Sequence, residues 1–218
     1  MKSLLKIILS FVSAVALEAV AFAQADQPLY ENNFEKATTG PVPEDMLVLD
    51  GAFAVKGEAG NKFLELPGAP LETYGVLFGP TGRDDIAVTA RIFSTARGRR
   101  TPAFGIGVNG QGGYRLQVAA AKRLVEFVQD DDVKASVPFE WQPGKWLHLK
   151  LQVRKVAADQ WKVEGKVWWQ GEKEPENWTI TADESKEPLN GRASIWGMPF
   201  AGTPIRFDDL TVARVTAK

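Results

Sequence analysis

Few residues of this sequence could carry acid–base or nucleophilic chemistry. The chain has 218 residues, no cysteine and a single histidine, His148. The lack of thiols excludes disulfides, thiolate metal sites and a cysteine nucleophile, and one histidine excludes a three-histidine zinc site. A serine-based triad would have to use His148, yet no G-x-S-x-G turn is present to expose a serine. The sequence therefore predicts no catalytic residue.

Aromatic side chains are better candidates, for binding. All seven tryptophans fall between residues 141 and 196. Strand alternation places Trp168 and Trp169 on opposite faces of one strand, and Trp169 shares its face with valines, so Trp168 points outward. Trp146 and His148 lie on the polar face of the preceding strand, which predicts that these two and Trp168 form a ligand-binding group on one outer sheet face. The alternative is that Trp168 and Trp178 pack on each other.

Charged runs offer a second set of candidates. The run Arg97–Arg100 is the strongest, and its Arg99 and Arg100 could engage an acidic glycan or an acidic partner. Such a run is more often a solvated hairpin loop. The acids of Asp130–Asp132 favour a turn, although they could also hold a cation. The alternating acids of Glu172–Glu176 stand beside a glycine and a proline, which indicates a solvated loop.

The overall composition restricts the class of protein. Twenty-six Lys and Arg residues face 27 Asp and Glu residues, for a formal net charge of −1. Nucleic-acid binding usually needs a basic face, so no nucleic-acid partner is expected. The proportions of hydrophobic residues (44%) and charged residues (24%) are those of a globular chain rather than a disordered one.

The first 25 residues are predicted to be a secretory signal peptide. Lys2 and Lys6 precede an apolar run, Ile7–Leu17, and small residues then suit cleavage after Ala23 or Ala25. The apolar run is too short to span a bilayer comfortably, so no membrane span is expected after cleavage. We expect the mature protein in the periplasm of a bacterium or outside the cell.

The rest of the chain, residues 26–218, is predicted to be one all-β domain. Apolar residues recur at every second position, which indicates half-buried strands rather than helices. The segments that follow this pattern or adjoin turn residues are 86–93, 104–108, 114–118, 123–129, 133–137, 146–153, 161–169 and 205–215. No linker or internal repeat interrupts them. Many short strands at near-regular spacing predict two antiparallel sheets packed as a sandwich or jelly roll.

Specific residues in the sequence resemble those of a known family of sandwich domains. The pattern W-x-x-G-x-x-E-P-x-x-W runs from Trp168 to Trp178, and Gly191 and the strand Ile205–Val212 follow it. Near the mature N-terminus stands Tyr30–Glu35. This arrangement resembles the concanavalin A-like, laminin-G-like jelly-roll domains of secreted bacterial proteins, over most of residues 29–215. The resemblance implies a concanavalin A-like β-sandwich, but this fold hosts binding modules, hydrolases, lyases and structural domains alike.

The resemblance also implies a possible metal. In many such modules a structural calcium ion links the first strand to the last, which would place its ligands at Glu35 and at Asp208 or Asp209. Neighbouring residues of a strand point to opposite faces, so only one of the two aspartates is expected to contribute. The simpler alternative is that these aspartates bond backbone groups or pair with an arginine.

Together these observations predict a secreted, non-catalytic domain that binds carbohydrate or another extracellular ligand. One alternative is a divergent glycoside hydrolase or polysaccharide lyase of the same fold. The paired acids of an E-x-D-x-x-E strand, which the resemblance would supply for a hydrolase, are absent. The other alternative is a structural or protein-interaction domain of the cell envelope, which should present a contiguous apolar patch and no groove.

Overall fold

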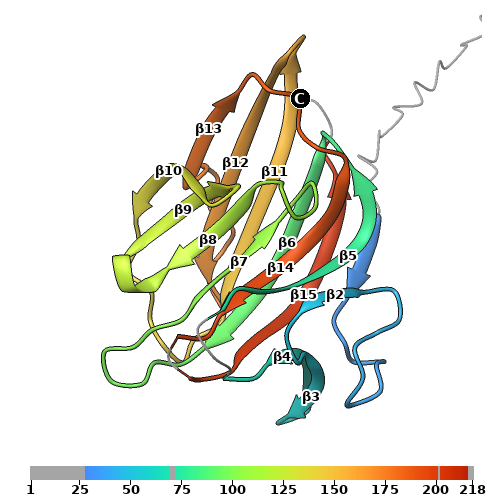
Figure 1. Ribbon diagram of the computed structural model, residues 1–218. Coiled ribbons are helices and arrows are strands. Elements are labelled where there is room, and N and C mark those ends of the chain that lie inside the picture. Colours follow the sequence, from blue (N-terminus) through green and yellow to red (C-terminus); the bar gives the residue numbers. More distant parts are fainter. Residues whose placement is uncertain (1–27, 69–71, 201, 216–218) are drawn as a thin grey trace, which may run out of the picture.

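The computed structural model describes residues 28–68, 72–200 and 202–215, which form fifteen strands and one short 3₁₀ helix (Figure 1). The predicted signal peptide, residues 1–25, lies outside these residues. Within them, no helix is long and apolar enough to cross a membrane. The all-β class expected from the period-two pattern is confirmed.

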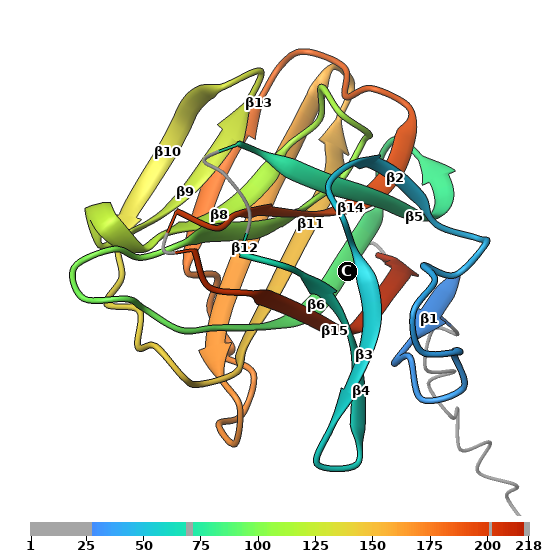
Figure 2. The same cartoon turned by 60° about the horizontal axis from the view of Figure 1, so that its bottom comes forward.

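The strands form two antiparallel sheets that face each other (Figures 1 and 2). The eight-stranded sheet has the order β13 (Ile180–Glu184), β12 (Gln160–Trp169), β11 (Leu147–Ala157), β6 (Ile86–Ser94), β15 (Ile205–Arg214), β4 (Asn61–Leu66), β3 (Ala54–Glu58), with β1 (Tyr30–Asn32) also paired to β15. The seven-stranded sheet has the order β10 (Asp132–Pro138), β9 (Leu124–Gln129), β8 (Arg115–Ala119), β7 (Ala103–Gly107), β14 (Gly191–Met198), β5 (Tyr74–Gly82), β2 (Leu47–Asp50). The sandwich predicted from sequence is thus confirmed.

Strands β11 and β12 show why the alternation of apolar residues predicted the strands correctly. They pair along almost their whole length, from Leu147 opposite Trp169 to Ala157 opposite Gln160. The inward positions are buried and the outward positions carry polar side chains, because one face meets the core and the other meets water. Between β8 and β9, which match the predicted segments 114–118 and 123–129, the chain forms only the 3₁₀ turn Ala120–Lys122.

The core lies between the sheets and is built mainly from aromatic and branched aliphatic side chains. Its largest fully buried members include Phe78, Phe104, Phe127 and Phe207. Gly165 faces this core from β12, and a Cβ there would come within 3.0 Å of side-chain carbons from Leu116, Ile180 and Phe127. A glycine at this inward position therefore lets the opposite sheet approach closely.

Candidate functional site

The outer face of the eight-stranded sheet carries a ladder of polar cross-strand pairs. On β11 and β12, His148 lies opposite Trp168, Lys150 opposite Lys166, Gln152 opposite Glu164, and Arg154 opposite Lys162. Apart from Arg154, which follows the predicted segment 146–153, these residues occupy the outward positions that the alternation predicts for the two strands. The ladder is therefore fixed by the same alternation that buries the other face.

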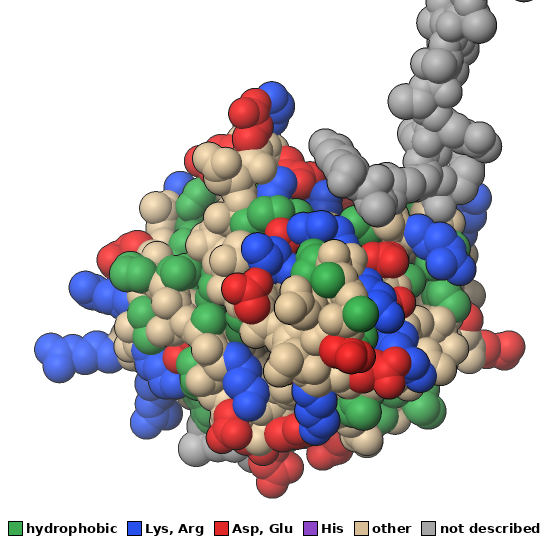
Figure 3. All heavy atoms as spheres, turned by 90° about the horizontal axis from the view of Figure 1, so that it is seen from above, with side chains coloured by type: hydrophobic (Ala, Val, Ile, Leu, Met, Phe, Trp, Pro, Cys, Tyr) green, Lys and Arg blue, Asp and Glu red, His purple; other side chains and the backbone are tan. Residues whose placement is uncertain are grey.

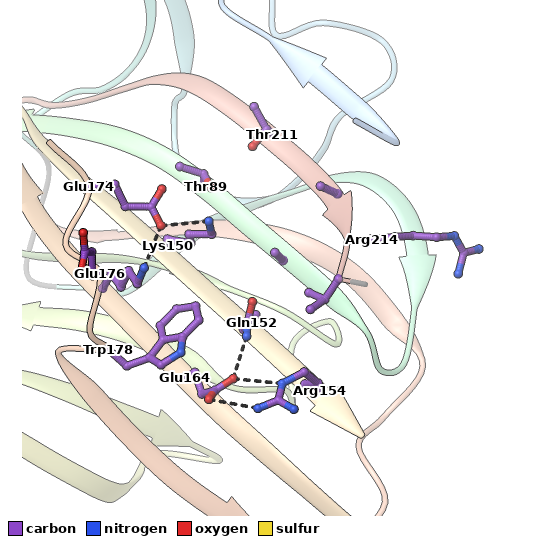
Figure 4. A pocket seen from close by; sticks show the side chains of 14 residues that line it. Thr89, Lys150, Gln152, Arg154, Glu164, Glu174, Glu176, Trp178, Thr211 and Arg214 are labelled. Carbon is purple, nitrogen blue, oxygen red and sulfur yellow. Dashed lines mark hydrogen bonds and ion pairs between the residues drawn. The ribbon is translucent and has the colours of Figure 1, made fainter. Parts of the chain in front are cut away.

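Beside this ladder the sheet surface is hollowed into a groove of about 780 Å³ (Figure 4). The strands β6 and β15 contribute four small outward side chains there, Ala87, Thr89, Thr211 and Ala213, and Arg214 at the end of β15 points away from them (Figure 4). Thr89 pairs with both Lys150 and Thr211, so the small residues stand directly beside the long ones. The groove exists because side-chain length falls sharply from one strand to the next.

The connection from β12 to β13 forms one side of the groove and brings in residues that the sequence assigned to a solvated loop. Glu174 reaches over the sheet, and its Oε1 lies 3.0 Å from the Nζ atoms of both Lys150 and Lys166 (Figure 4). Burial raises the pKa of Glu174, but hydrogen bonds from Lys166 and Lys150 outweigh it and hold this pKa below its ordinary value. Glu174 is therefore ionised at neutral pH. Its segment is a mostly exposed loop, as predicted, but Glu174 itself is partly buried against the sheet, which the sequence analysis did not foresee.

A second carboxylate lies deeper on the same face. Glu164 is buried and accepts a 2.6 Å hydrogen bond from Gln152, and Arg154 donates to both of its oxygens at 3.3 and 3.4 Å. Trp178 closes the same side of the groove, with the Nζ of Lys166 at 4.6 Å from the centre of its ring. Trp178 packs here under Lys166 rather than against Trp168.

The predicted aromatic group does share this outer face. His148 and Trp168 stack with ring centroids 5.1 Å apart and an interplanar angle of 9°. Trp146 immediately precedes β11, and its ring contacts Phe93 and the guanidinium of Arg91. The common face of Trp146, His148 and Trp168 is thus confirmed, whereas their contact with a ligand stays a prediction.

A second hollow lies at the end of the ladder where β11 begins. It has a volume of about 540 Å³, and Trp146 and Trp169 line it together with Gln142, Lys145, Gln170 and Glu172.

The predicted basic residues Arg99 and Arg100 belong to the β6–β7 connection, where a turn closes with two backbone hydrogen bonds between Arg97 and Arg100. Both are exposed and neither lines the groove. The solvated hairpin turn considered in the sequence analysis is what the fold shows there.

The aspartates proposed as metal ligands are engaged by a cation of the protein itself. Arg91 lies 2.6 Å from the carboxylate of Asp208 and 2.8 Å from that of Asp209. The expectation that the two aspartates face opposite sides was wrong, because Asp209 has a φ of 49° at a register shift in β15 and turns toward the same arginine.

These carboxylates do not fit a calcium ion as they stand. Asp208 also accepts a hydrogen bond from Asn61 at 2.9 Å, and Glu35 accepts one from the backbone N–H of Lys62 at 2.8 Å. Calcium prefers several oxygen ligands that are free to converge on it. Among the described residues no group of three or more acidic or histidine side chains is placed to hold a metal ion. Calcium binding stays a prediction of the resemblance.

The stacking of His148 has a measurable consequence. Burial, and then the charge of Arg91, lowers the pKa of His148 below its ordinary value of about 6.5, although Asp209 acts the other way. We expect an NMR titration of this single histidine, in protein without a histidine tag, to show a midpoint below 6.5. Because the unfolded chain then binds the proton first as the pH falls, stability should decrease below about pH 6.5.

Replacing the stacked ring tests the cause. Trp168→Ala exposes the imidazole and should move the His148 midpoint up toward 6.5, whereas Trp178→Ala, which removes a ring that His148 does not stack on, should leave it in place. A wild-type midpoint at or above 6.5 would contradict the half-buried, stacked arrangement.

Sequence reasoning named the outer face but missed most of the groove. Lys150, Gln152, Glu164 and Lys166 were visible as the polar positions of two alternating strands, and that signal could have been followed further. Glu174 carried no such signal, because its position depends on how the β12–β13 connection folds back over the sheet.

Comparisons with known proteins place the fold. No protein-family model matches the sequence, and no curated protein is significantly similar to it. Solved structures do match. A galectin-like protein of unknown function from Bacillus subtilis has a TM-score of 0.61 and 12% identity, covering 88% of this chain and 97% of that one. The carbohydrate-binding module CBM66 from Bacillus subtilis has a TM-score of 0.54 and 17% identity, with 78% and 95% covered.

An enzyme shares the fold as well. The catalytic domain of a glycoside hydrolase family 131 protein from Coprinopsis cinerea has a TM-score of 0.57 and 9% identity, covering 88% of this chain and 96% of that one. At such identities the likeness shows the fold alone. The concanavalin A-like β-sandwich expected from the sequence is confirmed.

Proposed function

We propose that this protein is a secreted, non-catalytic domain that binds carbohydrate in the groove on the outer face of its eight-stranded sheet. The observation that carries the proposal is the groove itself: small side chains form its floor, and hydrogen-bonding groups and one tryptophan ring stand along its side. Sugars offer hydroxyl groups to such polar side chains and C–H faces to an aromatic ring. The likeness to a carbohydrate-binding module supports this reading.

The arrangement of acids favours binding over hydrolysis. Glycoside hydrolysis needs one carboxyl group that is protonated and can donate to the leaving oxygen. In the groove Glu174 is held ionised by two lysines, Glu164 is bound by Arg154 and Gln152, and the third acid, Glu176, is exposed and pairs with Lys173. His148 stacks on Trp168 and is not among the residues that line the groove.

The surface supports sugar more than protein as the partner. The exposed large hydrophobic residues of the described chain are scattered over separate elements: Leu29, Leu47, Val133, Val156, Leu189 and Phe200. Figure 3 likewise shows acidic and basic side chains interspersed on the face seen from above, with hydrophobic ones scattered between them. A docking face for protein would more often present a contiguous apolar patch.

Binding to a glycan panel tests the proposal. We expect at least one plant, algal or bacterial glycan to raise the melting temperature of the mature protein, because a ligand of the native state stabilises it by mass action. Trp178→Ala should weaken that binding about tenfold, which corresponds to about 1.4 kcal/mol. The matched control is Trp196→Ala, since Trp196 lies on the other sheet with Arg115 at 5.1 Å over its ring.

Two outcomes would contradict the proposal. If no glycan binds at millimolar sugar, the domain has a structural or protein-binding role instead. If Trp196→Ala weakens binding as much as Trp178→Ala while both variants stay folded, the ligand does not occupy the groove.

A further inference from the structure

One pair in the ladder is unfavourable by itself. Lys150 and Lys166 lie directly opposite each other on neighbouring strands. Like charges in this position repel, at a distance where opposite charges would stabilise the sheet. The side chain of Lys166 is only 9% exposed, so water screens its charge poorly. This place on the sheet therefore requires an anion.

The protein supplies that anion from a loop rather than from the sheet. Both ammonium groups meet at one oxygen of Glu174, whose side chain is 38% exposed. The connection that carries it is fixed to β12 at its two ends, by the N–H of Glu172 on the carbonyl of Trp169 and by the N–H of Thr179 on the carbonyl of Gly165. Glu174 lies between these anchors, so it can leave the lysines without breaking a pairing of the sheet.

The surroundings suit an acidic sugar in its place. Trp178 presents its ring beside Lys166, Thr89 adjoins Lys150 on the groove floor, and Gln152 occupies the next position of the ladder. Arg154 also lines the groove, where it pairs with Glu164. A carboxylate attached to a sugar ring would meet two ammonium groups while its ring and hydroxyl groups met the aromatic and polar neighbours.

We propose that Lys150 and Lys166 bind the carboxylate of a uronic acid unit in an acidic polysaccharide, and that Glu174 occupies this position as an intramolecular competitor until the ligand displaces it. This inference rests on the proposed function and names its ligand class. The apparent association constant for the ligand is then reduced in proportion to the fraction of molecules in which the two lysines are free of Glu174.

Calorimetry with tetragalacturonate and its full methyl ester tests the proposal, because the two share a sugar backbone and differ in charge. We expect the wild type to bind the acid and not the ester. Glu174→Gln should bind the acid about fivefold more tightly, since the competitor is neutral. Lys166→Met and Lys150→Met should each lose binding of the acid. Melting temperatures establish that every variant is folded.

The matched control is Glu140→Gln. Glu140 lies outside the groove, on the connection between β10 and β11, and it pairs with Arg123 where both side chains are largely exposed. This variant removes the same charge without freeing Lys150 and Lys166, so it should change the affinity little. An equal gain in affinity from Glu174→Gln and Glu140→Gln would overturn the competitor, because the change in net charge would then explain both.

The remaining outcomes separate this inference from the proposed function. If neutral glycans or the methyl ester bind as well as the acid, the protein binds carbohydrate but the uronate site is wrong. If a sulfated tetrasaccharide binds more tightly than tetragalacturonate, the lysine pair serves sulfate esters and the uronate assignment fails. If no glycan of either kind binds, both proposals fall.

Discussion

Asp208→Asn is expected to lower the free energy of unfolding by about 3 kcal/mol or more. Asp208 is fully buried, and its carboxylate lies 2.6 Å from a guanidinium nitrogen of Arg91, whose side chain is itself mostly buried. Neutralising the aspartate leaves the cation without its closest partner in a place where water cannot replace it. Urea unfolding at pH 7 measures the difference, provided that the unfolding free energies of wild type and variant depend equally steeply on urea concentration.

Asp209→Asn is the matched control, because Asp209 contacts the same arginine from a position that is 47% exposed. Asparagine tolerates the left-handed backbone that Asp209 adopts, so the variant removes charge without adding strain. Its cost should stay below about 1 kcal/mol, as for other exposed pairs. Equal costs for the two variants would contradict a buried Arg91–Asp208 pair.

The same two variants test calcium. If added calcium raised the melting temperature of the wild type and Asp208→Asn abolished that rise, the carboxylate would bind metal rather than serve Arg91 alone. The enclosure of Asp208 by Arg91 and Asn61 would then not exclude calcium.

The sandwich was predictable because one face of each central strand packs against the core and the other face carries mostly polar side chains. From Leu147 to Val153 in β11 and from Trp161 to Val167 in β12, buried apolar residues or glycine alternate with polar ones, so the sequence itself shows which face meets the core. The strands near the N-terminus carry less of this signal. Strand β3 lies at the edge of its sheet and is mostly exposed, and β5 begins with three buried residues in a row. Neither alternates, and the period-two pattern did not find them.

The site was predictable only as far as alternation reaches. Alternation placed His148 and Trp168 on one face, and their pairing across β11 and β12 makes them stack. It failed at Asp208 and Asp209, because a bulge in β15 shifts the register and turns both toward Arg91. It could not find Glu174 either, since an irregular loop has no period from which its direction can be inferred.

Two tryptophans of β12 test this logic with a large expected effect. Trp161 points inward and is 2% exposed, and its indole N–H donates to Asp84 at 3.2 Å. Trp161→Ala should therefore reduce the free energy of unfolding by about 3–5 kcal/mol, because it leaves a cavity in the core. Trp168 points outward on the same strand, and Trp168→Ala should cost about 1 kcal/mol or less.

The contrast bears directly on function. If removing a ring hardly lowers the free energy of unfolding, the fold does not depend on the contacts of that ring. The ring is then available to a ligand. If Trp168→Ala proved as destabilising as Trp161→Ala in urea unfolding, Trp168 would be a structural residue and its stack with His148 would belong to the architecture of the sheet. If the two losses of unfolding free energy differ as expected, the inward residues of β11 and β12 stabilise the fold, whereas outward side chains such as Trp168 contribute little to it. Any loss of glycan binding in a folded Trp168→Ala variant would then report contact with the ligand, not damage to the sheet.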